Sequence, residues 1–111
     1  MSHIQAPTDF ERRVHLVGQA ISQAAQASSA EHHLPSELRD SINRVDRLSD
    51  QVRALLLAGE QARVGKLVAD MATQASRARR VCTNIAGLSA QLRGAVNHMY
   101  SQILELQRDL Q

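Results

Sequence analysis

Two adjacent histidines are the first side chains whose type and spacing could do chemistry. His32 and His33 follow Glu31 directly and lie close to Glu37. Imidazole and carboxylate groups are ligands of zinc and nickel. Adjacent residues in a connection between helices rarely point at the same ion, however, and no cysteine or third histidine is near in sequence. We therefore expect ordinary polar residues here, and no metal site.

His15 and His98 lie in segments with helical periodicity, where a histidine could relay a phosphoryl group. Phosphotransfer bundles usually place lysine and glycine shortly after that histidine. His98 is followed by Met-Tyr-Ser-Gln and His15 by Leu-Val-Gly, so neither matches this pattern. We expect both to be surface residues.

Cys82 is the single cysteine, which rules out a disulfide within the chain. It falls at an apolar seam position, where cysteine behaves as a small hydrophobic residue. Helical geometry points Arg79 and Arg80 away from that seam, and no histidine is near to act as a base. A catalytic thiol is therefore not expected. In a dimer of long antiparallel helices, Cys82 could instead meet its copy.

Basic residues form the best candidate for a polar binding surface. Asp70 is the only acid between residues 61 and 104, and Arg77 and Arg80 are three apart, so they share a helix face. Such a face suits phosphate backbones through counterion release, although a helix-turn-helix, a basic tail and interleaved aromatic residues are missing. An acidic protein is at least as good a partner as nucleic acid. The predicted basic surface comprises Arg63, Lys66, Arg77, Arg80 and Arg93.

Motifs that specify catalysis are absent from the sequence. It has no glycine-rich phosphate loop, no paired carboxylates, no GxSxG and no CxxC. We therefore predict a protein without enzymatic activity and without a cofactor.

The composition is that of one globular domain. The chain has 111 residues, of which 43% are hydrophobic and 22% charged, which is ordinary for a folded protein of single-domain length. Phe10 and Tyr100 are the only aromatic residues, which argues against a surface that stacks bases. The start of the chain lacks the features of a secretory signal, and no apolar run is long enough to cross a membrane. We expect a cytoplasmic protein without membrane contact.

Apolar periodicity predicts the elements that must carry these side chains. Residues 1–7 show none and are interpreted as a flexible tail, and residues 8–111 as a single helical-bundle domain. Thr8 and Glu11 form a capping box that opens the first helix, and Pro35 suits the first turn of the second. Their apolar stripes follow steps of three and four: Phe10, Val14, Val17, Ile21 and Ala24, then Leu38, Ile42, Val45, Ser49, Val52 and Leu56.

After Gly59, which suits a helix end, the apolar seam continues in steps of three or four from Val64 to Leu110. One reading is a single helix over 60–109, about 75 Å long. The other ends a helix at Gly87 and caps the next with Ser89. The unbroken phase favours the single helix, bent near Gly87. The predicted fold is therefore an all-α antiparallel bundle of three or four helices, with a long heptad-patterned C-terminal helix bent or broken near Gly87.

A long C-terminal helix would leave half of its seam uncovered within one chain, so we predict a homo-oligomer, in the simplest case a dimer. The function expected is that of a non-enzymatic helical interaction protein, such as an adaptor, a chaperone-like protein or an assembly subunit. The alternative is a nucleic-acid-associated regulator that uses the basic surface around Arg77 and Arg80. The predicted protein-interaction residues are Leu92, Val96, Met99, Ile103, Leu106 and Leu110.

Overall fold

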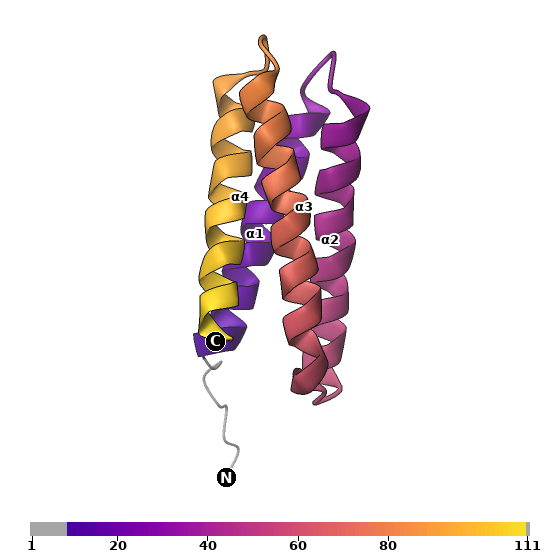
Figure 1. The fold of residues 1–111 in the computed structure, drawn as a ribbon, viewed down its shortest axis with the longest axis vertical. Helices are drawn as coiled ribbons and strands as arrows, with labels where there is room; N and C mark the ends of the chain where they lie inside the picture. Colours follow the sequence, from indigo (N-terminus) through magenta and orange to yellow (C-terminus); the bar gives the residue numbers. More distant parts are fainter. Residues whose placement is uncertain (1–8, 111) are drawn as a thin grey trace.

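Four α-helices make up most of residues 9–110, the part of the chain that the computed structural model describes (Figure 1). They are α1 (Asp9–Ser29), α2 (Ser36–Leu57), α3 (Val64–Asn84) and α4 (Ala90–Asp109), with a short 3-10 turn, η1 (Gln61–Arg63), before α3. The predicted tail over 1–7 and the Thr8 cap lie outside the described residues.

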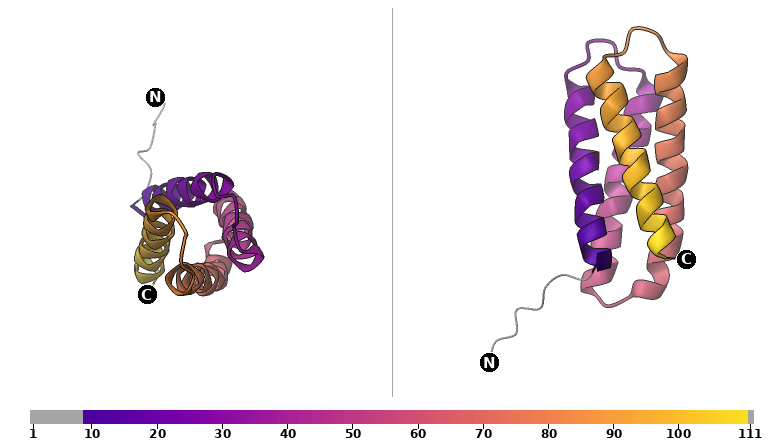
Figure 2. Two further views of the ribbon diagram at one scale, coloured as in Figure 1. Left: turned by 90° about the horizontal axis from the view of Figure 1, so that it is seen from above. Right: turned by 90° about the vertical axis from the view of Figure 1, so that its left-hand side faces the viewer.

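Successive helices run antiparallel and form a four-sided bundle, seen end-on in Figure 2. Each helix packs against the two beside it. The closest pairings are α2 with α3 and α1 with α4, whereas α1 and α2 touch less extensively. The predicted all-α bundle is thus confirmed.

One core of aliphatic side chains and alanines runs along the bundle. The stripes predicted for the first two helices are buried in it, apart from Phe10 and Leu56, which are partly buried at its edge. Small buried residues let the helices approach closely. They include Ala20, Ala24, Ser41, Ser49, Ala75 and Ala78.

The connection between α2 and α3 is a tight reversal at Gly59. This glycine has φ +75°. The N–H of Gly59 donates to the Leu56 carbonyl at 3.1 Å, and that of Glu60 donates to the Leu55 carbonyl at 2.8 Å. This pair of bonds is the Schellman motif, which satisfies the last carbonyls of a helix.

The expected single helix over 60–109 is wrong, because the chain reverses between α3 and α4. Ile85 is extended, Gly87 has φ +92°, and the Ser89 hydroxyl caps α4 by accepting the Leu92 N–H at 3.1 Å. Ile85 and Leu88 still pack against the core from within this loop. The spacing of three and four between apolar residues therefore continues through this turn, although the helix ends before it.

This reversal also corrects the predicted interaction residues. Five of the six are at most 1% exposed, because α1 and α3 cover the inner face of α4. They belong to the core of the chain itself and are not available to a partner in this fold. Leu110 alone of the six is exposed, at 39%. The buried five are Leu92, Val96, Met99, Ile103 and Leu106.

Within residues 9–110, no helix combines the length and the apolar character needed to cross a bilayer.

Candidate interaction surfaces

The five residues of the predicted basic surface do not lie together. Arg63 ends η1 and Lys66 lies in the first turn of α3; they pair with Glu60 at 3.1 Å and with Asp70 at 3.4 Å, respectively. Arg77 lies near the other end of that helix, about 17 Å from Lys66 at 1.5 Å per residue. The basic residues of α3 therefore form two separate groups, of which the first is neutralised by its own acids.

Arg93 has a structural role in the α3–α4 connection. Its side chain is partly buried, and its Nη2 donates a hydrogen bond to the Ile85 carbonyl at 2.9 Å. Arg79 joins the same two helices, since its guanidinium lies 5.2 Å from the centre of the Tyr100 ring, within the range of a cation–π contact. The side chains of Arg93 and Arg79 therefore each contact another residue of the same chain.

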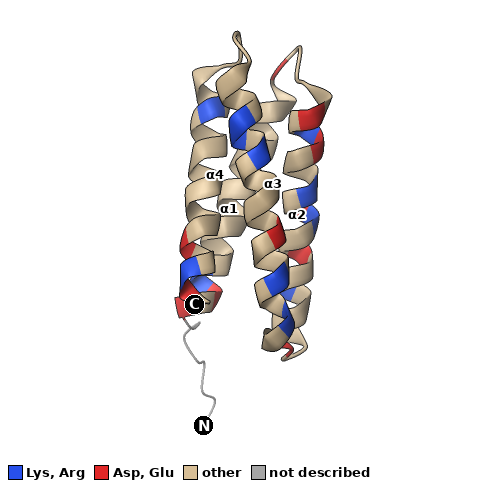
Figure 3. Cartoon of the chain, in the orientation of Figure 1, with Lys and Arg blue, Asp and Glu red and all other residues tan. Residues whose placement is uncertain are grey.

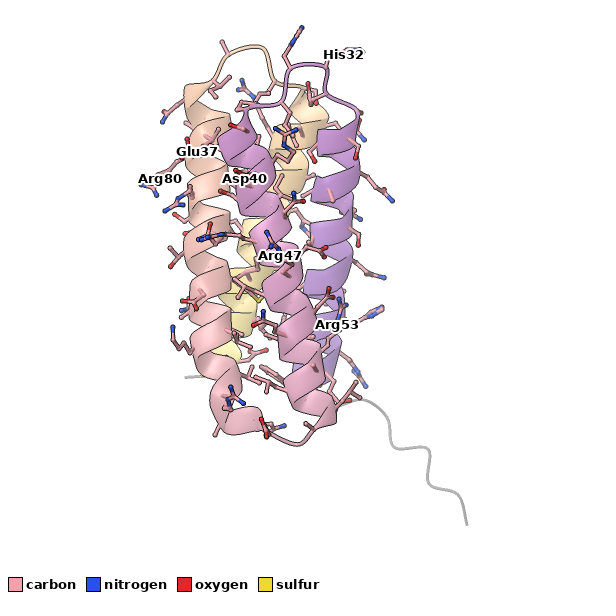
Figure 4. All side chains as sticks on the ribbon, turned by 90° about the vertical axis from the view of Figure 1, so that its right-hand side faces the viewer. His32, Glu37, Asp40, Arg47, Arg53 and Arg80 are labelled. Carbon is pink, nitrogen blue, oxygen red and sulfur yellow. The ribbon has the colours of Figure 1, made fainter. Side chains whose placement is uncertain are left out.

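Four arginines line two hollows between α2 and α3. At one end, Arg77 and Arg80 line a hollow of about 310 Å³ together with Glu37 of α2. Figure 4 shows Glu37, Asp40 and Arg80 near this end of the bundle. Further along, Arg44 and Arg47 line a second hollow, of about 430 Å³. We call the two hollows together the α2/α3 groove; it is lined also by Leu48, Gln51, Asp70, Thr73, Gln74, Val81, Asn84 and Ile85.

Arg44 and Arg47 were missed in the sequence because acids alternate with arginines along that helix. The spacing of Asp40 and Arg44 predicts an ion pair, but this pair does not form. The sequence feature that could have identified them is their three-residue spacing, which puts Arg44 and Arg47 on one helix face, as it does Arg77 and Arg80. None of these four arginines has an ion pair within residues 9–110.

A contrasting surface is formed by α1 and α4, which lie side by side (Figure 2). Residues 14–30 and 94–104 contain no lysine, arginine, aspartate or glutamate, and Figure 3 shows the middle of α4 free of charge beside the charged α2 and α3. We call the exposed residues of these two uncharged stretches the α1/α4 face. They are mainly glutamine, serine, alanine, glycine and asparagine, and they include His15, Leu16 and His98.

The histidines of the described part of the chain are not gathered into a site. His32 (Figure 4) and His33 are exposed in the loop between α1 and α2, and His15 contacts Gln19, with 3.3 Å between its Nε2 and the amide nitrogen. Among residues 9–110 no three metal-ligating side chains are close enough to share an ion.

The α1–α2 loop and the α3–α4 loop lie at the same end of the bundle and are joined by a hydrogen bond (Figure 1). Glu31 Oε1 accepts the backbone N–H of Ser89 at 3.0 Å. Hydrogen bonds from the Ser89 side chain and backbone lower the pKa of Glu31.

Cys82 is buried, 4% exposed, and this burial raises the pKa of its thiol. A buried, protonated thiol is a poor nucleophile.

No protein-family model matches this chain, and comparisons with curated proteins and with solved structures likewise give no match.

Proposed function

We propose that this chain is a non-enzymatic helical interaction protein that forms a homodimer through its α1/α4 face. The observation that supports the proposal is the lack of charge over 14–30 and 94–104, on two helices that lie side by side. The centres of protein interfaces are depleted in charged residues. Of the three large apolar residues that are exposed within residues 9–110, Leu16 belongs to α1 and Leu110 follows the end of α4.

Symmetry favours a second copy as the partner of this face. In a twofold dimer the same patch meets itself, so a charged patch would bring like charges together near the axis. An uncharged face avoids this repulsion. Ala90, Gly94 and Ser101 are small and exposed on α4, and small side chains let two helices approach closely.

The size of the face suits a dimer that dissociates on dilution. The uncharged stretches extend about 24 Å along α1 and about 16 Å along α4, set about 10 Å apart, and so present a face of roughly 400 Å². Two such faces bury about 800 Å², which is the range of weak, transient contacts. An adaptor, a chaperone-like protein or an assembly subunit would use a reversible contact of this kind.

The test is the solution mass of the wild type and of Gly94→Arg, measured by light scattering over a range of concentrations. A Cβ at Gly94 would meet no atom within 4 Å, and arginine is the better helix former, so the variant keeps its fold. We expect a concentration-dependent dimer for the wild type and the 12.2 kDa monomer for Gly94→Arg.

Gly65→Arg is the matched control. Gly65 lies on α3 and is equally open around its Cβ position, so this variant adds the same charge away from the α1/α4 face. It should dimerise like the wild type. A wild type that stays monomeric at millimolar concentration, or equal dissociation of both variants, would contradict the proposal.

A further inference from the structure

The α2/α3 groove carries more positive charge than the protein itself neutralises. Arg44, Arg47, Arg77 and Arg80 have no ion pair within residues 9–110. Of the two acids that line the groove, Asp70 is already paired with Lys66, which leaves Glu37. We propose that this groove binds an acidic amphipathic helix of another protein.

The two hollows together span the length of a short helix. They share no lining residue; on α3 the first extends from Asp70 to Gln74 and the second from Arg77 to Asn84. The distance from Asp70 to Asn84 is about 21 Å at 1.5 Å per residue, or about four turns of a bound helix. The arginines stand three residues apart on each helix of the groove. Carboxylates spaced three or four residues apart on a partner helix share one face and can meet them.

The groove also has apolar positions for the other face of such a partner. Leu48 and Ile85 are partly buried at the edge of the core, and Val81 is 9% exposed.

An acidic helix fits this surface better than nucleic acid does. Duplex DNA presents one phosphate charge about every 1.7 Å along its axis, and such a continuous series would pass the carboxylates of Glu37 and Asp70. A protein helix can place its carboxylates opposite the arginines only. The groove lies on α2 and α3, so this proposal is independent of dimerisation through α1 and α4.

The probe for the test is a synthetic helical peptide of about 16 residues, about 24 Å long, with leucine on one face and glutamate along its flanks. One comparator has lysine in place of glutamate, and another is a random DNA duplex of about 20 base pairs. We expect the glutamate peptide to bind and to shift the backbone amide resonances of α2 and α3 in isotope-labelled protein. The lysine peptide should leave these resonances unchanged.

Two double variants test the arginines. Arg47→Gln/Arg80→Gln removes one arginine from each hollow and should weaken peptide binding about fivefold or more, since each exposed ion pair contributes a modest amount. Arg12→Gln/Arg39→Gln removes the same charge from exposed positions outside the groove and should change the affinity by less than about twofold.

Three results would overturn the proposal. The first is an equal loss of peptide affinity in both double variants. The second is a set of peptide-induced resonance shifts confined to α1 and α4. The third is binding of the DNA duplex through these arginines when the glutamate peptide does not bind. All four substituted arginines are exposed, so the variants keep the fold, and thermal unfolding checks this directly.

Discussion

At the scale of single residues, one carboxylate joins parts of the chain that are far apart. Glu31 and Ser89 are 58 positions apart, and their hydrogen bond connects the α1–α2 loop to the start of α4. The Ser89 hydroxyl also caps α4 through the Leu92 N–H. The sequence indicated Ser89 as a helix cap, but nothing local in it identifies Glu31 as its partner, because that contact exists only once both loops meet at one end of the bundle.

The Glu31 bond predicts a pH dependence of stability. Hydrogen bonds from Ser89 lower the pKa of Glu31 in the folded protein. This contribution is therefore fully present above the unfolded pKa, near 4.3, and is lost as the pH falls through the folded pKa. Between about pH 5 and about pH 3, the melting temperature of Glu31→Gln should fall less than that of the wild type, as followed by circular dichroism.

Glu37→Gln is the control for this experiment, since no hydrogen bond to the Glu37 side chain is found in the described part of the chain. This variant should retain the pH dependence of the wild type. If Glu31→Gln retains it as well, the bond to Ser89 does not contribute to stability in solution.

At the scale of elements, the extent of the C-terminal helix was predicted less well than the residues that it buries. Apolar residues continue at steps of three and four from Cys82 through Ile85 to Leu92, although residues 85–89 are not helical. Ile85 and Leu88 pack on the core from the loop. The periodicity of the apolar residues therefore predicted which side chains pack on the core, whereas Gly87 and Ser89 indicated where the backbone turns.

Alanine substitutions at Gly87 and Gly94 should have opposite effects on stability, because Gly87 lies in a turn and Gly94 within a helix. Gly87 has φ +92°, so Gly87→Ala should lower the free energy of unfolding by about 1 kcal/mol or more. Gly94 lies within α4, and a Cβ added there would have no atom within 4 Å, so Gly94→Ala should raise it by about 0.5–1 kcal/mol. Urea denaturation measures both, and stabilisation by Gly87→Ala would contradict the turn.

At the scale of the whole molecule, the pattern of apolar residues predicted an all-α antiparallel bundle, and the structure has one. The surfaces could not be predicted in the same way. Lys66 and Arg80 share α3 but lie toward opposite ends of it, and Arg47 and Arg80 line neighbouring hollows only because α2 packs against α3. Such neighbours depend on how each helix is rotated about its axis, which the order of polar residues along one helix does not determine.

A closed bundle of one chain predicts that Cys82 reacts only when the protein opens. The thiol is buried near the C-terminal end of α3, and burial raises its pKa, so labelling by a thiol reagent should follow the population of the unfolded state. Ile103→Ala removes a fully buried side chain and should cost about 2–5 kcal/mol. Each 1.4 kcal/mol is about tenfold in that population, so labelling should accelerate by at least about 25-fold.

Ser101→Ala, at an exposed position on the same helix, should leave the labelling rate within about twofold of the wild type. A dimer built from open, paired long helices would behave differently, because the two copies of Cys82 would meet and oxidise to a linked dimer. Rapid labelling of the native protein, or such a disulfide-linked dimer under mild oxidation, would show that the chain does not cover its own core. If labelling of the wild type is slow and Ile103→Ala accelerates it, the bundle is closed. Any self-association must then use its outer surface, where the α1/α4 face lies.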